Sequence, residues 1–167
     1  KFLREMEFNR LLSSAISAYG EPSLGSIKTI TKPENNQKKI DKKNYHLILD
    51  PKEIDKWVKE AEEVGELAID TETSSLDPHQ ADLIGVSLST KIGKACYIPI
   101  GHNSKKSINK DLVLKKLKPL LEDMSVKKIG QNIKFDFIVL FRHGIIISSM
   151  EDTMLMSYVL DAGKNRH

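Results

Sequence analysis

The chain has 167 residues, of which 40% are hydrophobic and 29% are charged, a composition that excludes collagen-like and wholly disordered proteins. Its length suits one domain with a piece of a second. No apolar run approaches the roughly 18 residues of a membrane span, so we expect no membrane partner. The formal net charge of +3 arises within residues 21–44, so nucleic-acid binding is permitted but not indicated. The single cysteine, Cys96, cannot form an internal disulfide, which favours a reducing compartment.

The first 44 residues divide into a predicted helix and a predicted linker. Within residues 1–20, apolar side chains recur at helical spacing from Phe8 to Tyr19, which predicts one amphipathic helix. A lone helix of this length is marginal in water, so its apolar stripe must contact another surface. Residues 21–44 contain prolines, an Asn-Asn-Gln-Lys-Lys run and no aromatic residue, which is typical of a flexible linker.

Regular structure is predicted from Tyr45 onward, beginning with a strand over 45–49. Asp50 and Pro51 indicate the start of a helix, and Gly65 indicates its end. The next predicted elements are three strands that could form an antiparallel meander, over 66–72, 83–89 and 95–100.

The remaining elements alternate between helix and strand. A helix is predicted over 110–121, and Pro119 should bend or shorten it. After it we predict a strand over 126–129, a helix over 132–143, a strand-like segment over 145–147 and a helix over 152–160. Together these elements predict an α/β fold in which helices cover a mixed sheet.

Pairs of acids two residues apart occur four times, at Glu5/Glu7, Glu53/Asp55, Glu60/Glu62 and Asp70/Glu72. The first three pairs fall on predicted helices, where solvated charge explains them. The fourth falls on a predicted strand, so Asp70 and Glu72 should share one face with Ala68, opposite Leu67 and Ile69. Adjacent carboxylates repel unless a cation compensates, and hard oxygen ligands suit Mg²⁺ or Mn²⁺. On spacing alone, hydrated acids at a strand end are the favoured interpretation.

Asp136 lies in a predicted helix that is apolar nearly all round, so this helix should be buried against the sheet. A carboxylate there is costly unless it is hydrogen-bonded or coordinated. In one interpretation Asn132 caps the helix and Asp136 benefits from its positive end. In the other, Asp136 joins Asp70 and Glu72 around a pair of metal ions.

Three runs of sequence carry a resemblance to a known family: AIDTETSSLDP over 68–78, IGQNIKFDFIVL over 129–140 and EDTMLMSYVLDAGKNRH over 151–167. They closely resemble the proofreading 3′–5′ exonuclease domain of bacterial DNA polymerase I, one of the DEDD exonucleases with a ribonuclease H-like fold. The resemblance covers about 45–167. In addition, FLREMEFNRLL over 2–12 is similar to the last helix of that polymerase's 5′ nuclease domain.

The resemblance implies roles for individual residues. Its first two motifs match Asp70, Glu72 and Asp136, which would hold two divalent ions, Mg²⁺ or Mn²⁺, and catalyse hydrolysis. Thr73 and Leu76 would hold the 3′-terminal nucleotide of DNA. The resemblance further implies contacts from Gln131 and Asn132 to the substrate strand, a bacterial cytoplasmic location, and polymerase and 5′ nuclease domains as partners in the parent chain. Lys127, Lys128 and Lys134 flank the second motif and could meet phosphates, although such lysines are more often solvated.

One family motif, Tyr-x-x-x-Asp, is not matched. Tyr158 and Asp161 are three residues apart rather than four, so we assign Tyr158 to helix packing and expect Asp152 to cap a helix. We therefore expect a C-terminally incomplete exonuclease domain with little or no activity of its own. Two alternatives remain: a free-standing ribonuclease D-like exonuclease acting on RNA, and a vestigial scaffold that binds no metal.

Overall fold

The computed structural model describes residues 2–20, 42–101 and 107–161. Contacts divide the chain into two units, Lys1–Lys38 and Lys39–His167. The predicted linker over 21–44 lies largely outside the described residues. Within the residues described, no helix is both long enough and apolar enough to span a membrane.

The N-terminal unit contains two helices, α1 (Phe2–Glu5) and α2 (Asn9–Tyr19), so the prediction of one continuous helix is wrong. The chain reverses at Glu7, whose φ of 57° is left-handed. This reversal brings the rings of Phe2 and Phe8 into edge contact at a centroid distance of 6.3 Å. This ring contact joins the two segments, but neither helix buries a residue, so the predicted apolar stripe is still partly exposed.

The second unit is built on a six-stranded sheet in the order β1-β4-β3-β2-β5-β6. The strands β2, β3 and β4 form the predicted antiparallel meander, while β1, β5 and β6 each run parallel to their neighbour. The sheet is therefore mixed, as predicted. Its strands are β1 (Tyr45–Leu47), β2 (Glu66–Thr73), β3 (Leu83–Lys91), β4 (Lys94–Pro99), β5 (Lys127–Gly130) and β6 (Met150–Asp152).

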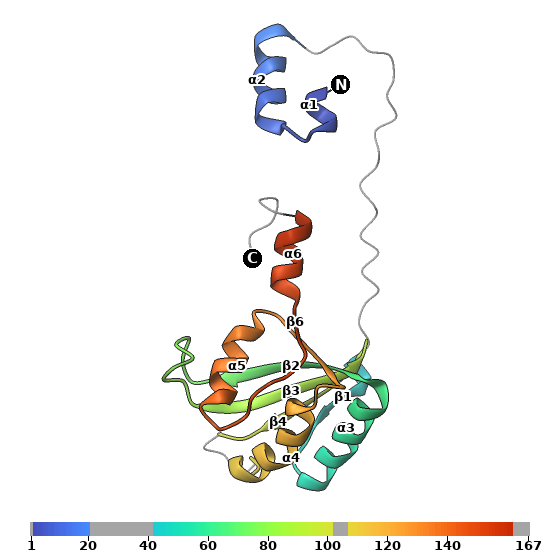
Figure 1. Cartoon of the computed structure of the whole chain (residues 1–167), viewed down its shortest axis with the longest axis vertical. Coiled ribbons are helices and arrows are strands. Elements are labelled where there is room, and N and C mark those ends of the chain that lie inside the picture. Colours follow the sequence, from blue (N-terminus) through green and yellow to red (C-terminus); the bar gives the residue numbers. More distant parts are fainter. Residues whose placement is uncertain (1, 21–41, 102–106, 162–167) are drawn as a thin grey trace. The chain divides into compact units, whose positions relative to one another are not determined.

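Helices α3 (Pro51–Val64) and α4 (Lys110–Glu122) lie side by side and pack against the sheet (Figure 1). The start of α3 is as predicted, because the Asp50 side chain accepts a hydrogen bond from the Lys52 N–H at 2.9 Å. Trp57 faces inward from α3 and is only 6% exposed, so it belongs to the core. The other elements are a short 3₁₀ turn (Lys42–Asn44), α5 (Ile133–Phe141) and α6 (Thr153–Asp161).

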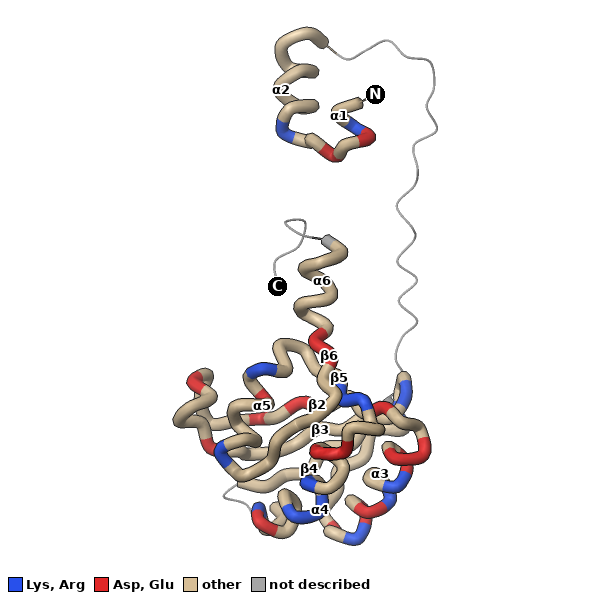
Figure 2. Tube along the Cα trace, viewed as in Figure 1, with Lys and Arg blue, Asp and Glu red and all other residues tan. Residues whose placement is uncertain are grey.

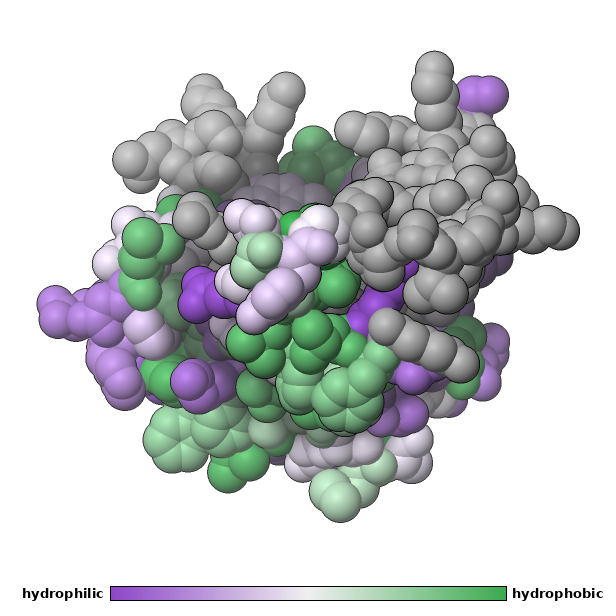
Figure 3. All heavy atoms as spheres, turned by 90° about the horizontal axis from the view of Figure 1, so that it is seen from above, coloured by the Kyte–Doolittle hydropathy of each residue, from purple (hydrophilic) through white to green (hydrophobic). Residues whose placement is uncertain are grey.

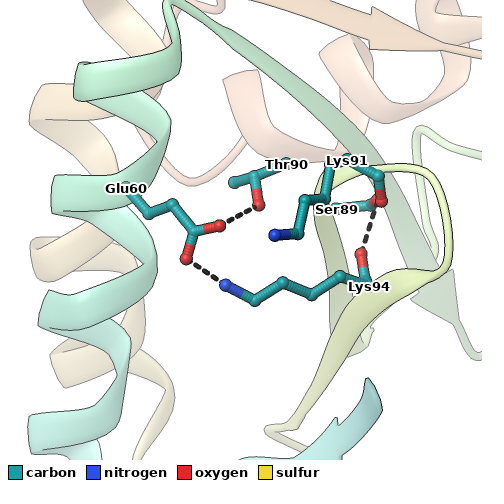
Figure 4. A network of polar contacts seen from close by, with 5 residues as sticks. All are labelled: Glu60, Ser89, Thr90, Lys91 and Lys94. Carbon is teal, nitrogen blue, oxygen red and sulfur yellow. Dashed lines mark hydrogen bonds and ion pairs between the residues drawn. The ribbon is translucent and has the colours of Figure 1, made fainter. Parts of the chain in front are cut away.

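A polar network attaches the β3–β4 hairpin to α3 (Figure 4). The Glu60 carboxylate accepts a hydrogen bond from the Thr90 hydroxyl at 2.7 Å and forms an ion pair with Lys94. The Ser89 hydroxyl donates to the carbonyl oxygens of Lys94 and Lys91, at 2.8 and 3.1 Å. The hairpin and the helix are therefore joined by polar contacts as well as by the core.

One helix of the C-terminal half is close to its prediction, and one strand is not. Helix α4 covers the predicted 110–121 and ends at Glu122, and Pro119 does not shorten it because Leu120 and Leu121 in its last turn are buried in the core. The segment over 145–147 pairs with no strand, and the strand lies later, at β6. Ile145 and Ile147 are nevertheless buried, so the apolar alternation indicated burial rather than strand pairing.

Candidate active site

Strand β2 presents two carboxylates on one face of the sheet. Its side chains alternate between buried and exposed: Leu67, Ile69 and Thr71 are buried, whereas Asp70 and Glu72 are exposed. This is the alternation predicted from the sequence. It follows from the two-residue period of a strand, with the apolar set facing the core.

Helix α5 brings the third predicted carboxylate to the same strand. Strand β5 runs parallel to β2, and α5 begins shortly after β5 ends at Gly130. Asp136, in the first turn of α5, is only 3% exposed. Its Oδ1 accepts hydrogen bonds from the Thr71 backbone N–H at 2.8 Å and the Thr71 hydroxyl at 2.6 Å. Asp136 is thus joined to β2 at the residue between Asp70 and Glu72.

Asn132 occupies the N-cap position of α5 but makes no capping hydrogen bond through its side chain, so the prediction of a side-chain cap is wrong. It adopts a left-handed conformation with φ of 54°, and its backbone N–H donates to Asp152 Oδ1 at 2.9 Å. The same Oδ1 accepts from the Met154 N–H at 2.9 Å. Asp152 is therefore the cap of α6 that the sequence predicted, and it also joins the start of α5 to the start of α6.

Acidic positions lie on neighbouring parts of β2 and α5 (Figure 2), and burial acts on two of these carboxylates. Desolvation raises the pKa of Asp70. Desolvation likewise raises the pKa of Asp136, the hydrogen bonds from Thr71 lower it, and the charge of Asp70 raises it further. Two neighbouring acids whose charged forms are both disfavoured would be stabilised by a bound cation.

A cavity of about 470 Å³ opens beside these carboxylates. Leu76 is one of its lining residues and is 95% exposed. Thr73 is another, and its hydroxyl donates a hydrogen bond to the Ser75 carbonyl at 2.9 Å. Sequence reasoning missed Phe135 as a lining residue, although its place directly before Asp136 was a usable signal. The cavity is lined by Asp70, Thr71, Glu72, Thr73, Ser74, Ser75, Leu76 and Phe135.

The remaining predicted substrate residues do not lie in that cavity. Gln131 lines a second hollow of about 470 Å³ on the same sheet face, together with Ser87 and Thr153. Asp70 borders both hollows, whereas Asn132 lines neither.

Tyr97 is a second residue that sequence reasoning missed. Its ring lies across Gly85, where an added Cβ would fall 2.1 Å from the tyrosine oxygen. Gly85 is the cross-strand partner of Glu72, and the charge of Glu72 contributes to raising the pKa of Tyr97. The absence of a side chain at Gly85 therefore lets the phenol approach the Glu72 end of the site.

Two of the three lysines beside the second motif make contacts away from the site, whereas Lys134 is exposed. Lys128 is fully buried, and its Nζ donates to the carbonyl oxygens of Asp123 and Val126. Lys127 forms an ion pair with Glu151 at 2.9 Å. Lys128 therefore cannot meet a phosphate without leaving the core.

No three His, Cys, Asp or Glu side chains among the described residues come close enough to hold one metal ion. The structure brings together Asp70 and Asp136, with Glu72 two residues further along the same face of β2. Oxygen donors, burial and raised pKa values fit a hard divalent cation, but Glu72 must turn toward the pair to complete such a site.

A family model described as 3′–5′ exonuclease matches residues 45–167, which is most of the chain. The chain belongs to the 3′–5′ exonuclease family. The match includes all three carboxylates and both hollows beside Asp70, so the exonuclease assignment rests on the unit that carries the candidate site.

Relatives of this exonuclease include DNA polymerase I of Pseudomonas aeruginosa, which is 42% identical over 130 residues and covers 74% of the chain. DNA polymerase I of Rhizobium leguminosarum is 41% identical over 149 residues and covers 77%. The chain spans only 14% and 15% of the lengths of these two relatives. It corresponds to the exonuclease portion of DNA polymerase I homologues.

Solved structures confirm the predicted ribonuclease H-like fold. Brucella melitensis NrnC with bound Mg²⁺ is 31% identical with a TM-score of 0.52, over 74% of this exonuclease and 56% of that chain. Escherichia coli RNase D is 17% identical with a TM-score of 0.58, over 74% and 31%. The likeness to RNase D shows the fold alone, whereas the polymerase relatives favour the polymerase interpretation over the ribonuclease D-like one.

Proposed function

We propose that this exonuclease removes nucleotides from DNA 3′ ends as the proofreading unit of a bacterial DNA polymerase I. The observation that carries the proposal is the joining of Asp136 to Thr71, between Asp70 and Glu72 and beside an open cavity. This arrangement holds acids from β2 and α5 against one another at the edge of a space large enough for a nucleotide.

Two divalent ions, Mg²⁺ or Mn²⁺, would be held by Asp70, Glu72 and Asp136. The Mg²⁺ in a NrnC structure supports this choice of ion. When bound, such ions supply activation of the attacking water and stabilisation of the departing 3′ oxygen. The protein's own contribution is to hold Asp136 rigidly through Thr71, so that its second carboxylate oxygen remains for a ligand.

The 3′-terminal nucleotide would enter the cavity that Thr73 and Leu76 border, with Leu76 against its base. The high exposure of Leu76 supports this role, because a large apolar side chain held in solvent gains free energy when a base covers it. Gln131 would contact the strand from the second hollow, which Asp70 also borders. Asn132, its neighbour in the chain, would contact the strand as well, although it lines neither hollow.

The longer relatives support a parent chain with further domains. Residues 45–167 would be the N-terminal portion of the exonuclease domain, residues 1–20 the end of a 5′ nuclease domain and residues 21–44 the connection between them. The polymerase domain of the same parent would supply the frayed or single-stranded DNA end as substrate.

Digestion of 3′-labelled single-stranded DNA in Mg²⁺ or Mn²⁺ tests this function. The experiment compares this chain, a version extended through the Tyr-x-x-x-Asp motif, and the extended version with Asp70→Ala. We expect only the unsubstituted extended version to cut, and Asp70→Ala to abolish cleavage in it because a metal ligand is lost. Cleavage that survives Asp70→Ala would refute the site.

Two further measurements distinguish the two alternatives: hydrolysis of DNA and RNA strands of the same sequence, and titration with a divalent metal. Preference for the RNA strand over the DNA strand would favour a ribonuclease D-like exonuclease. An inert extended version that also fails to bind Mn²⁺ in calorimetry would indicate a scaffold domain.

A further inference from the structure

We propose that Arg142 is a positioning residue that holds the loop carrying Leu76 in its substrate-binding conformation. The proposal rests on the proposed function, since Leu76 is assigned there to the 3′-terminal base. Arg142 lies outside the two carboxylate motifs. It directly follows the end of α5, whereas Asp136 lies in the first turn of this helix.

The loop over 74–82 connects β2 to β3 and is closed by hydrogen bonds at its base. The Ser74 N–H donates to the Asp82 carbonyl at 3.0 Å, and the Asp82 N–H donates to the Ser74 hydroxyl at 2.9 Å. Within the loop, Asp77 accepts from the His79 N–H and from the Gln80 side-chain amide, each at 2.9 Å. These bonds organise the second half of the loop, whereas Leu76 lies at its exposed tip.

Arg142 attaches this second half to another element. Its Nη1 donates to the Ala81 carbonyl at 2.6 Å and to the Pro78 carbonyl at 3.2 Å. Ala81 is fully buried, so one of the two acceptors is fixed in the core. A guanidinium that bridges two carbonyls restrains the segment between them.

The segment of α5 and Arg142 therefore contacts a wall of the cavity at one end and the loop that continues this wall at the other. Near the start of α5, Asp136 binds Thr71 on β2, and directly after the end of the helix Arg142 binds the loop that follows β2. Because one short helix makes both contacts, the position of Leu76 is linked to the position of the carboxylates. A loop without the second contact would leave Leu76 free to move away from the base.

The test measures exonuclease kinetics in the full-length parent polypeptide for Arg142→Ala, Leu76→Ala and the double variant. Arg142→Ala should raise KM for single-stranded DNA about threefold to tenfold while kcat changes by less than about twofold. If Arg142 acts through Leu76, the double variant should be no worse than Leu76→Ala alone. If the increase in KM of the double variant equals the product of the increases in the two single variants, the proposal is refuted.

Two further readouts separate positioning from general stability. Fluorescence of a 3′-terminal 2-aminopurine, measured on DNA bound in EDTA so that it is not cut, should fall in Arg142→Ala because a base that loses its contact with Leu76 can stack on its neighbour and be quenched. Amide exchange over 74–82 should become faster. Lys118→Ala is the matched control, because Lys118 donates to the Gly144 carbonyl near the same helix end but does not contact the loop. It should leave all three readouts unchanged.

The two proposals fail in different ways. A wild-type parent that does not cut DNA would refute the proposed function. Unchanged amide exchange over 74–82 in Arg142→Ala would refute the restraint by Arg142 itself, whether or not the enzyme is active.

Discussion

At the scale of single residues, the contact between Asp136 and Thr71 is the most constrained feature of the site. A carboxylate that is 3% exposed must replace its lost hydration with donors, and Thr71 provides two of them from one residue. Thr71, whose side chain points away from the face of Asp70 and Glu72, thus holds the carboxylate that α5 brings to the same strand.

Replacing Thr71 tests this support. Thr71→Val keeps the shape and the backbone donor but removes the hydroxyl, so the free energy of unfolding should fall by about 1–3 kcal/mol. Urea unfolding monitored by circular dichroism measures the change, and Thr71→Ser should stay close to wild type. If Thr71→Val unfolds at the wild-type midpoint, the hydroxyl contributes nothing to holding Asp136.

Gly85 offers a second residue-scale prediction. Gly85→Ala introduces a Cβ that overlaps the Tyr97 ring, so it should destabilise the fold by about 1–3 kcal/mol. Adding Tyr97→Ala should remove most of that penalty, and the coupling is measured by a double-mutant cycle in urea. If the two substitutions lower the free energy of unfolding additively, the overlap between the new Cβ and the Tyr97 ring is not the cause of the destabilisation.

At the scale of elements, the polar contacts between α3 and the β3–β4 hairpin include those of one carboxylate, Glu60. Hydrogen bonds from Lys94 and Thr90 hold the pKa of Glu60 below its ordinary value of 4.5. Because the folded state favours the ionised form, the contribution of Glu60 to stability is fully present above about pH 4.5. It is lost as the pH falls through the lower pKa of the folded state.

Glu60→Gln should therefore destabilise the fold by about 1 kcal/mol at pH 7, and the difference from wild type should shrink as the pH falls below 4.5. Thermal unfolding at a series of pH values measures this. Glu63→Gln is the control, because its pair with Lys59 is 3.8 Å apart and both side chains are largely exposed. A pH-independent difference would show that the Glu60 charge is not the cause.

At the scale of the whole exonuclease unit, the face of β2 that packs into the core is not the face that carries the acids. One face buries the apolar side chains of β2 against the core, and the other presents the acids and both hollows. Apolar side chains also lie on the surface of the molecule (Figure 3). Leu155, Val159 and Leu160 of α6 are among the exposed apolar residues. The chain spans only a small part of its polymerase relatives.

Much of this arrangement could be predicted from local sequence signals. Asp50, Pro51 and Gly65 bounded α3 correctly, since capping and turn chemistry depend on adjacent residues. The face of Asp70 and Glu72 followed from strand periodicity. The prediction for residues 1–20 was wrong because the reversal at Glu7 depends on contact between α1 and α2 rather than on hydrophobic spacing.

The family, most of the elements from Tyr45 onward and the strand face of the acids could be inferred from residue types that are close together in the chain. Which groups contact one another follows instead from how the elements pack. Asp136 lies 65 residues from Thr71 in the chain, and Arg142 lies 61 from Ala81. No local pattern encodes these partners, because the parallel pairing of β5 with β2 and the packing of α5 bring them together.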